Sequence, residues 1–111
     1  MTPICFFGEL VAPSESGRLY VDHDVEIYGA WISAIAGTGT SSFEIYRNDE
    51  LLQSFTVGAA QVYQKIDIIS YEKERFLFDA PNDFIYIAAT GTSGGHKNVV
   101  VQFLAYDNEG R

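Results

Sequence analysis

Residues 41–55, "SSFEIYRNDELLQSF", predict two short strands joined by a tight turn. Asn48 and Asp49 stand at the centre, and both residue types are common in the two-residue turns of β-hairpins. A turn there fixes the pairs across the hairpin, which we expect to be Arg47–Glu50, Tyr46–Leu51, Ile45–Leu52 and Glu44–Gln53. This pairing gives one apolar face and one mostly polar face. We therefore expect a half-buried hairpin rather than a binding site.

The rest of the chain repeats this pattern of short apolar or alternating runs between turn residues. No long stretch has the apolar period of an amphipathic helix. We expect strands near residues 4–11, 18–22, 24–35, 43–47, 51–57, 61–69, 74–79, 84–90 and 97–106. Short strands at this spacing in 111 residues predict one all-β domain over residues 1–111, built as a sandwich or barrel.

Three of the expected strands are apolar on both faces: "VEIYGAWISAI" at 25–35, "DFIYIAAT" at 83–90 and "NVVVQFLAY" at 98–106. An antiparallel sheet with one face in water should instead alternate apolar and polar residues. Because a sandwich of this size has one interior, the second apolar face indicates an interface with another subunit or a partner protein. The alternative is that the outward Ala, Tyr and Val residues are tolerated at the surface.

We select six candidate interface residues from these strands: Tyr28, Ile32, Tyr86, Ile87, Phe103 and Tyr106. Alternation alone does not decide which face of each strand is core and which is contact.

The composition narrows the class of partner. The formal net charge is −8, from 15 acidic and 7 basic residues, and the bases form no basic run. Nucleic acid is therefore not an expected partner, because its phosphates are bound largely by Lys and Arg. Cys5 is the only cysteine, so no internal disulfide forms, which fits a reducing cytoplasm. We expect no signal peptide and no membrane-spanning segment.

Two glycine-rich stretches could be mistaken for phosphate-binding loops: "GTGTSS" at 37–42 and "GTSGGHKN" at 91–98. Such loops need a following helix, whose N-terminus holds the phosphate. Each stretch here is followed by an expected strand, so we interpret both as connections between strands.

No residue pattern predicts catalysis, a metal site or a cofactor. Asp22 and Asp24 would lie on one side of a strand and could share a cation, but their spacing matches no calcium-loop pattern. His23 and His96 are the only histidines, too few for a histidine-rich metal centre in one subunit. Cys5 stands in an apolar strand, where a thiol is normally inert, and no serine has a nucleophile-elbow pattern. We predict that the protein is not an enzyme.

Sugar binding is an alternative, because small β-sandwiches often display aromatic platforms. The candidates are Tyr20, Tyr28, Trp31, Tyr46, Tyr63, Tyr86 and Tyr106. Unbroken alternation would place Trp31 on the same face as Ile27 and Ile35, which favours a core position for its ring.

The order of features resembles small jelly-roll domains in the virions of tailed bacteriophages. Residues 19–55 are similar to their first half, in which an Ile-x-Gly strand, a Gly/Thr loop and an Asn-Gly hairpin follow one another. Here these are Ile27 to Gly29, Gly37 to Thr40, and a hairpin with Asn48–Asp49 in place of Asn-Gly.

Residues 75–107 are similar to the closing strands of those domains, which begin at a Phe-x-x-Gly-Asp corner. Phe78, Asp79 and residues 81–83 ("PND") stand at this position, so the corner also departs from the family pattern.

The resemblance implies an antiparallel β-sandwich of jelly-roll type with about eight strands. It also implies a structural virion protein made in the host cytoplasm, namely a capsid decoration or cement protein. Such a protein docks on a lattice such as the major capsid protein and is commonly a homotrimer. The alternative within the same group is a carbohydrate- or receptor-binding module of a phage fibre or spike. The resemblance supplies no catalytic or cofactor-binding residues.

Overall fold

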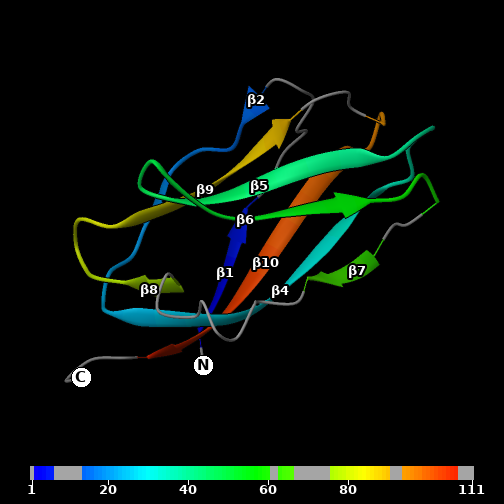
Figure 1. The fold of residues 1–111 in the computed structure, drawn as a ribbon. Helices are drawn as coiled ribbons and strands as arrows, with labels where there is room; N and C mark the ends of the chain where they lie inside the picture. The colour runs from blue at the N-terminus through cyan, green and yellow to red at the C-terminus, as the bar shows by residue number, and fades with distance from the viewer. Residues whose placement is uncertain (1, 7–13, 61–62, 67–75, 91–93, 108–111) are drawn as a thin grey trace.

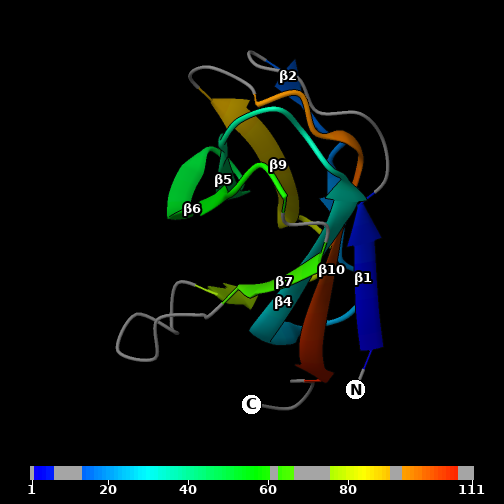
Figure 2. The same ribbon diagram turned by 90° about the vertical axis from the view of Figure 1, so that its right-hand side faces the viewer.

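The computed structural model describes residues 2–6, 14–60, 63–66, 76–90 and 94–107. These residues form two antiparallel sheets that pack face to face (Figures 1 and 2). Sheet A contains, in order, β1 (Thr2–Phe6), β10 (Lys97–Asp107), β4 (Val25–Ile35), and then β7 (Tyr63–Ile66) and β8 (Leu77–Phe78) along one edge of β4. Sheet B contains β2 (Ser14–Glu15) and β3 (Leu19–Tyr20) along one edge of β9 (Phe84–Thr90), and then β5 (Ser41–Arg47) and β6 (Glu50–Val57). The predicted all-β antiparallel sandwich is confirmed.

The expected strands agree closely with the observed ones. β2 is an additional short strand, which lies between the strands expected at 4–11 and 18–22. Parts of the strands expected at 4–11, 61–69 and 74–79 fall outside the described residues.

The strands pair in a nested order. β2 and β3 pair with different parts of β9, and β7 and β8 pair with different parts of β4. Each of these two couples therefore takes the place of a single strand in its sheet. The first strand then pairs with the last (β1 with β10), and the hairpin of β5 and β6 is the innermost pair. Every pair except this hairpin joins segments far apart in the chain, so local sequence does not specify the sheet order.

The core fills the space between the sheets. Its largest fully buried side chains are four phenylalanines, accompanied by isoleucines from β4, β5 and β9: Phe43, Phe76, Phe78, Phe103, Ile27, Ile32, Ile45, Ile85 and Ile87. Complete burial of each such side chain contributes about 1.5–3 kcal/mol. The core therefore supplies most of the stability, as expected for a domain without a disulfide.

A β-bulge in β4 reverses the expected facing of its second half. Two consecutive residues of β10 pair with Gly29 and Ile27, so Tyr28 is an extra residue in the ladder. Ile27 and Ala30 are both buried, and Trp31 consequently points to the outer face. The expectation of a core Trp31 was wrong, because one inserted residue exchanges the two faces of every residue beyond it.

A second bulge changes the expected hairpin register. The pairs Arg47–Glu50 and Tyr46–Leu51 are confirmed. Beyond them Ile45 pairs with Gln53 rather than with Leu52, and the expected Glu44–Gln53 pair is also wrong. Leu52 is the extra residue, and it remains buried in the core. The turn itself is as predicted, because Asn48 adopts a φ of 55°, the left-handed conformation that Asn tolerates well.

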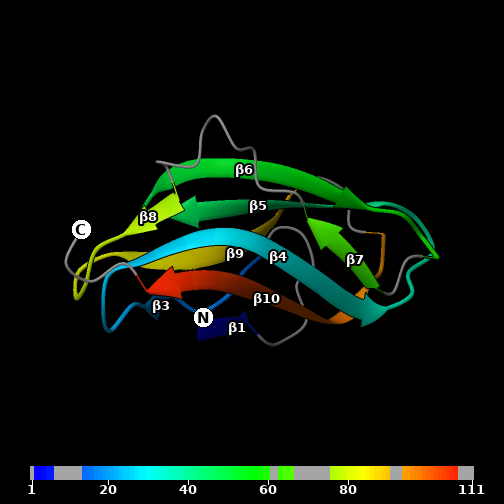
Figure 3. The same cartoon turned by 90° about the horizontal axis from the view of Figure 1, so that it is seen from below.

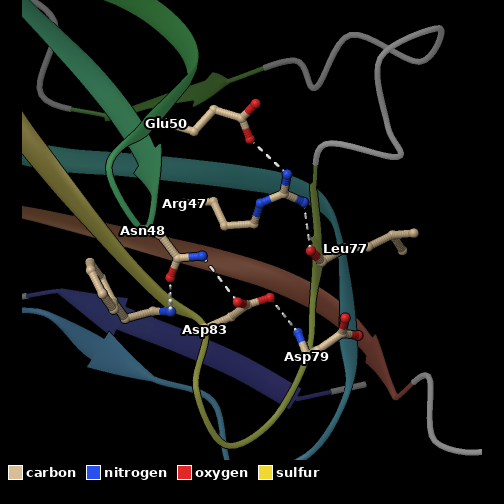
Figure 4. Close-up of polar contacts among 7 residues, drawn as sticks. Arg47, Asn48, Glu50, Leu77, Asp79 and Asp83 are labelled. Carbon is tan, nitrogen blue, oxygen red and sulfur yellow. Dashed lines mark hydrogen bonds and ion pairs between the residues drawn. The ribbon is translucent and has the colours of Figure 1, made fainter.

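The turn between β5 and β6 is bound to the corner between β8 and β9 (Figure 4). Asn48 donates from Nδ2 to Asp83 Oδ1 (3.0 Å) and accepts at Oδ1 from the Phe84 N–H (3.1 Å). Asp83 also accepts from the Asp79 N–H through Oδ2 at 2.8 Å. Arg47 donates to the carbonyl oxygen of Leu77 at 2.9 Å. The Asn48–Asp49 turn and the corner at residues 79–83 therefore contact each other.

Candidate interaction surface

The outer face of sheet A is the candidate functional surface. Here β10, β4 and β7 lie side by side (Figure 3). Alternation and the bulge in β4 turn a set of large apolar side chains outward, which we call the aromatic face: Tyr28, Trp31, Ile35, Tyr63, Leu104 and Tyr106. Tyr63, Ile35 and Tyr106 are 64%, 53% and 52% exposed. The two strands of sheet A that were expected to be apolar on both faces, β4 and β10, are thus neighbours and share one outer surface.

Two stacked ring pairs order this surface. Tyr28 and Tyr106 stack across β4 and β10 with ring centroids 4.3 Å apart. Trp31 and Tyr63 stack across β4 and β7 at 4.8 Å with an interplanar angle of 9°. Leu104 lies over Gly29 between the pairs, since a Cβ at Gly29 would be 3.8 Å from its Cδ1 atom. The side chains therefore hold one another in place before any partner binds.

Few charges lie on the aromatic face. On the outward positions of β4 and β7 the charged residues are Glu26, whose neighbour across the ladder is Tyr106, and Lys65, whose neighbour is Trp31. The outward positions of β10 between Val100 and Tyr106 carry no charge, but the exposed Lys97 at the start of β10 pairs with Ile35. The described part of this face thus has one acidic and two basic side chains around an uncharged centre, and depletion of charge is typical of the centre of an interface.

The outer face of sheet B is covered differently. Tyr86 in β9 is only 4% exposed, because Tyr46 stacks on it at 4.9 Å and the Arg18 guanidinium lies 4.7 Å from its ring centroid. Arg18 also lies over Phe84, and Tyr20 packs against the same ring. The chain itself therefore covers the second apolar face of β9, where we had expected a subunit or partner.

Two tyrosines on sheet B have altered acidity. Tyr46 donates its phenolic proton to Glu44 Oε1 at 2.7 Å. This hydrogen bond, together with burial and the negative charge of Glu44, raises the pKa of Tyr46 to about 12. Burial is also the main cause that raises the pKa of Tyr86. Both phenols are therefore neutral hydrogen-bonding groups at physiological pH.

The six predicted interface residues divide into two groups. Ile32, Ile87 and Phe103 are buried in the core of the single chain, and Tyr86 is covered by Arg18 and Tyr46. Tyr28 and Tyr106 lie on the aromatic face and stack on each other. Trp31, Ile35, Tyr63 and Leu104 lie on the same face but were not among the six. Trp31 was missed because the bulge in β4 reverses its facing.

The two carboxylates considered for a cation do not converge on one point. Asp24 accepts a hydrogen bond from the Ala80 N–H at 2.9 Å. Asp22 is 91% exposed and interacts with the imidazole of His23. Among the described residues, no group of three or more His, Cys, Asp or Glu side chains could hold a metal ion.

Ser41 and His96 form a buried pair that the sequence did not indicate. Ser41 Oγ lies 2.8 Å from His96 Nδ1, and the two residues are 2% and 1% exposed. The Gly94 N–H donates to the same Oγ at 2.9 Å, and His96 Nε2 lies 2.9 Å from the Gly58 carbonyl oxygen. Because a carbonyl oxygen only accepts, Nε2 carries the proton and the Ser41 hydroxyl donates to Nδ1.

A serine beside a histidine is also the arrangement of a nucleophile and its base. Here the Ser41 hydroxyl is enclosed and already occupied by two hydrogen bonds, so a substrate does not reach it. The pair instead joins the start of β5, the loop after β6 and the segment before β10.

The first glycine-rich stretch packs at this same end of the sandwich on the described part of the second, which begins at Gly94. The N–H groups of Thr38 and Gly39 both donate to the carbonyl oxygen of Gly94, at 2.6 and 3.1 Å. A Cβ at Gly94 would overlap the carbonyl of Gly39, and one at Gly37 would overlap the carbonyl of Gly94. Glycine is therefore required for close approach of two backbones, and the described N–H groups point into the protein rather than toward a phosphate.

Comparison with known proteins found no matching family model, no similar curated protein and no similar solved structure. The part of the chain that the structure describes contains no helix long and apolar enough to cross a membrane.

Proposed function

We propose that this protein is a structural, non-catalytic assembly protein: a virion component of the capsid decoration or cement type with a jelly-roll fold. It would bind other copies of itself, as a homotrimer by the resemblance, and dock on a larger protein lattice such as a major capsid protein. The observation that carries this proposal is the contiguous aromatic face on sheet A. The nested pairing of the strands supports the jelly-roll assignment.

The aromatic face favours protein contact for two reasons. Solvent-exposed patches of this kind in a small domain usually mark interfaces, and Trp and Tyr are enriched among the residues that contribute most to binding. In addition, the rings are already stacked in pairs, so that one face of each ring is covered by the other ring of its pair. A rigid, ordered surface loses little side-chain entropy when a protein partner covers it.

Size-exclusion chromatography with light scattering tests the proposal. We expect an oligomer whose dissociation constant rises at least about tenfold in Tyr106→Glu, because this variant places a charge among apolar contacts. Thr56→Glu is the matched control, since it adds the same charge to an exposed strand position of sheet B. Two negative results together would contradict the proposal. The wild-type protein would remain monomeric at every concentration, and no binding partner or lattice would be found among the products of neighbouring genes.

The second candidate is a carbohydrate- or receptor-binding module of a fibre or spike. Tyr63 is 64% exposed, and Gln102 pairs with Trp31 at the same place, so an aromatic ring and an amide lie together on one surface. Saturable binding of the monomer to a glycan array, abolished by Tyr63→Ala, would favour this candidate over assembly.

A further inference from the structure

The arginines and lysines that the structure describes are placed differently. Each of the two arginines forms an ion pair with a glutamate, namely Arg18–Glu15 and Arg47–Glu50. Lys65 and Lys97 take part in none of the ion pairs found among the described residues, and both are exposed. In a chain with 15 acidic and 7 basic residues, these two lysines leave positive charge that no described carboxylate neutralises.

Both lysines lie toward the same end of the aromatic face. Lys65 is the neighbour of Trp31 across β4 and β7, and Lys97 is the neighbour of Ile35 across β4 and β10. Glu26 is at the start of β4, five residues before Trp31 and therefore about 16 Å away along the strand. The described face is thus basic toward one end, where it attracts an anionic group.

Tyr63 offers an open ring face next to Lys65. Trp31 covers one face of this ring, since the two rings lie nearly parallel at 4.8 Å. Tyr63 is nevertheless 64% exposed, because β7 ends the described path of strands in sheet A (Figure 3). Tyr63 and Lys65 are two residues apart on β7, so they point to the same side of the sheet, about 7 Å from each other. An open aromatic ring and an ammonium group therefore lie side by side.

Two uncharged polar side chains flank the rings. Ser33 is the neighbour of Tyr63 across β4 and β7, and Gln102 is the neighbour of Trp31 across β4 and β10. A hydroxyl and an amide both donate and accept hydrogen bonds, as the hydroxyl groups of a sugar require. An open ring face packs against the C–H face of a sugar ring, and an ammonium pairs with a carboxylate.

We infer that this end of the aromatic face binds an acidic saccharide, with a sugar ring on the open face of Tyr63 and its carboxylate against Lys65. We call it the lysine end, and its residues are Trp31, Ser33, Ile35, Tyr63, Lys65, Lys97 and Gln102. The inference goes beyond assembly and rests on the second candidate function, to which it adds the class of sugar. Nucleic acid also combines rings with negative charge, but its dense phosphates are repelled by a chain of net charge −8.

Trp31 reports on binding at the lysine end, because it is the only tryptophan of the chain. The experiment screens an array of sialylated and uronic-acid oligosaccharides beside their neutral counterparts. Each oligosaccharide that binds is then titrated while the fluorescence and the indole N–H NMR signal of Trp31 are followed. We expect at least one acidic oligosaccharide to shift both signals saturably, and its neutral counterpart to bind at least about tenfold more weakly at low salt.

Paired variants test the two named contacts. Lys65→Gln should raise the dissociation constant of the acidic oligosaccharide about tenfold, whereas Lys65→Arg keeps the charge and should stay within about threefold of the wild type. Tyr63→Ala should weaken binding at least about tenfold, and Tyr63→Phe keeps the ring and should not. Lys97→Gln, further from the ring, should weaken binding about threefold. Far-UV circular dichroism and the unfolding midpoint show that each variant is folded.

Three results would overturn the inference. Equal affinity for acidic and neutral sugars would exclude the acidic class and leave the second candidate function standing. Binding of no sugar at all would overturn both the inference and sugar binding as a function. Saturable binding of a single-stranded oligonucleotide or an acidic peptide, but of no saccharide, would assign the lysine end to another anion. Light scattering of the wild type and Tyr106→Glu tests assembly separately, because Tyr106 lies beside Glu26 at the other end of the face.

Discussion

Asn48 and Asp83 join the β-hairpin turn to the corner that precedes β9, with Nδ2 of Asn48 donating to Oδ1 of Asp83 at 3.0 Å. The same Asn48 adopts a left-handed backbone conformation and accepts a hydrogen bond from the Phe84 N–H. One side chain thus satisfies the geometry of a local turn and fastens it to a segment 35 residues away.

Substitutions at Asn48 should separate these two roles. Asn48→Ala loses the side-chain hydrogen bonds and places a Cβ residue at positive φ, so we expect the free energy of unfolding to fall by about 2–4 kcal/mol. Asn48→Gly keeps the backbone conformation and should cost about 1–2 kcal/mol. Urea denaturation measures both; equal losses would show that the backbone conformation contributes nothing.

Gly94 should tolerate no larger residue. Gly94→Ala would force apart the backbones of the two glycine-rich stretches, since its Cβ would overlap the Gly39 carbonyl. We expect a loss of more than about 2 kcal/mol in unfolding free energy. Gly17→Ala is the control, because nothing lies within 4 Å of a Cβ there, and it should change stability by less than about 0.5 kcal/mol. Equal effects of the two variants would show that close packing at Gly94 is unimportant.

The Ser41–His96 pair predicts a specific tautomer. Nitrogen NMR of the imidazole should show the proton on Nε2 of His96, since this atom faces the Gly58 carbonyl oxygen. Ser41→Ala leaves the Gly94 N–H and His96 Nδ1 without their partner, so it should cost about 1–3 kcal/mol. Ser42→Ala, at the neighbouring and less buried position of β5, is the matched control. A proton on Nδ1 would refute the assigned hydrogen-bond directions.

The phenol of Tyr46 should lose its proton at a higher pH than an ordinary tyrosine. Near-ultraviolet absorbance of tyrosinate should show a phenol with a pKa of about 12, which disappears in Tyr46→Phe. Glu44→Gln removes the accepting carboxylate, the largest cause of the shift, so the pKa should fall toward the ordinary value of about 10. A wild-type protein whose tyrosines all titrate near the ordinary value would contradict this assignment.

The same pKa has a consequence for stability at high pH. The pKa of Tyr46 is higher in the folded protein than in the unfolded chain, so the unfolded chain loses its proton first as the pH rises. The stability that this group contributes is complete below about pH 10 and is lost progressively up to about pH 12. Denaturation at several pH values should show this decline, and the decline should be smaller in Tyr46→Phe.

Local sequence predicted much of this fold. Alternation and turn residues placed β4, β5, β6, β9 and β10 nearly where they lie, because a strand is recognised from residues that are adjacent in the chain. The Asn48–Asp49 turn was also predicted, since its backbone conformation depends on its own residue types. The sequence also showed that β4 and β10 are apolar on both faces; one face of each lies in the core, and the other lies on the aromatic face.

The tertiary structure alone decided which residues form the candidate surface. An extra residue at Tyr28 turned Trp31 outward, and whether a ladder contains such a residue depends on the partner strand, which lies about 75 residues away in sequence. Arg18 covers Tyr86 and removes it from the surface, and Ser41 meets His96 across 55 residues. Sequence pattern records the period of each strand, but the register between distant strands and the side chains that close over them arise only when the sheets pack.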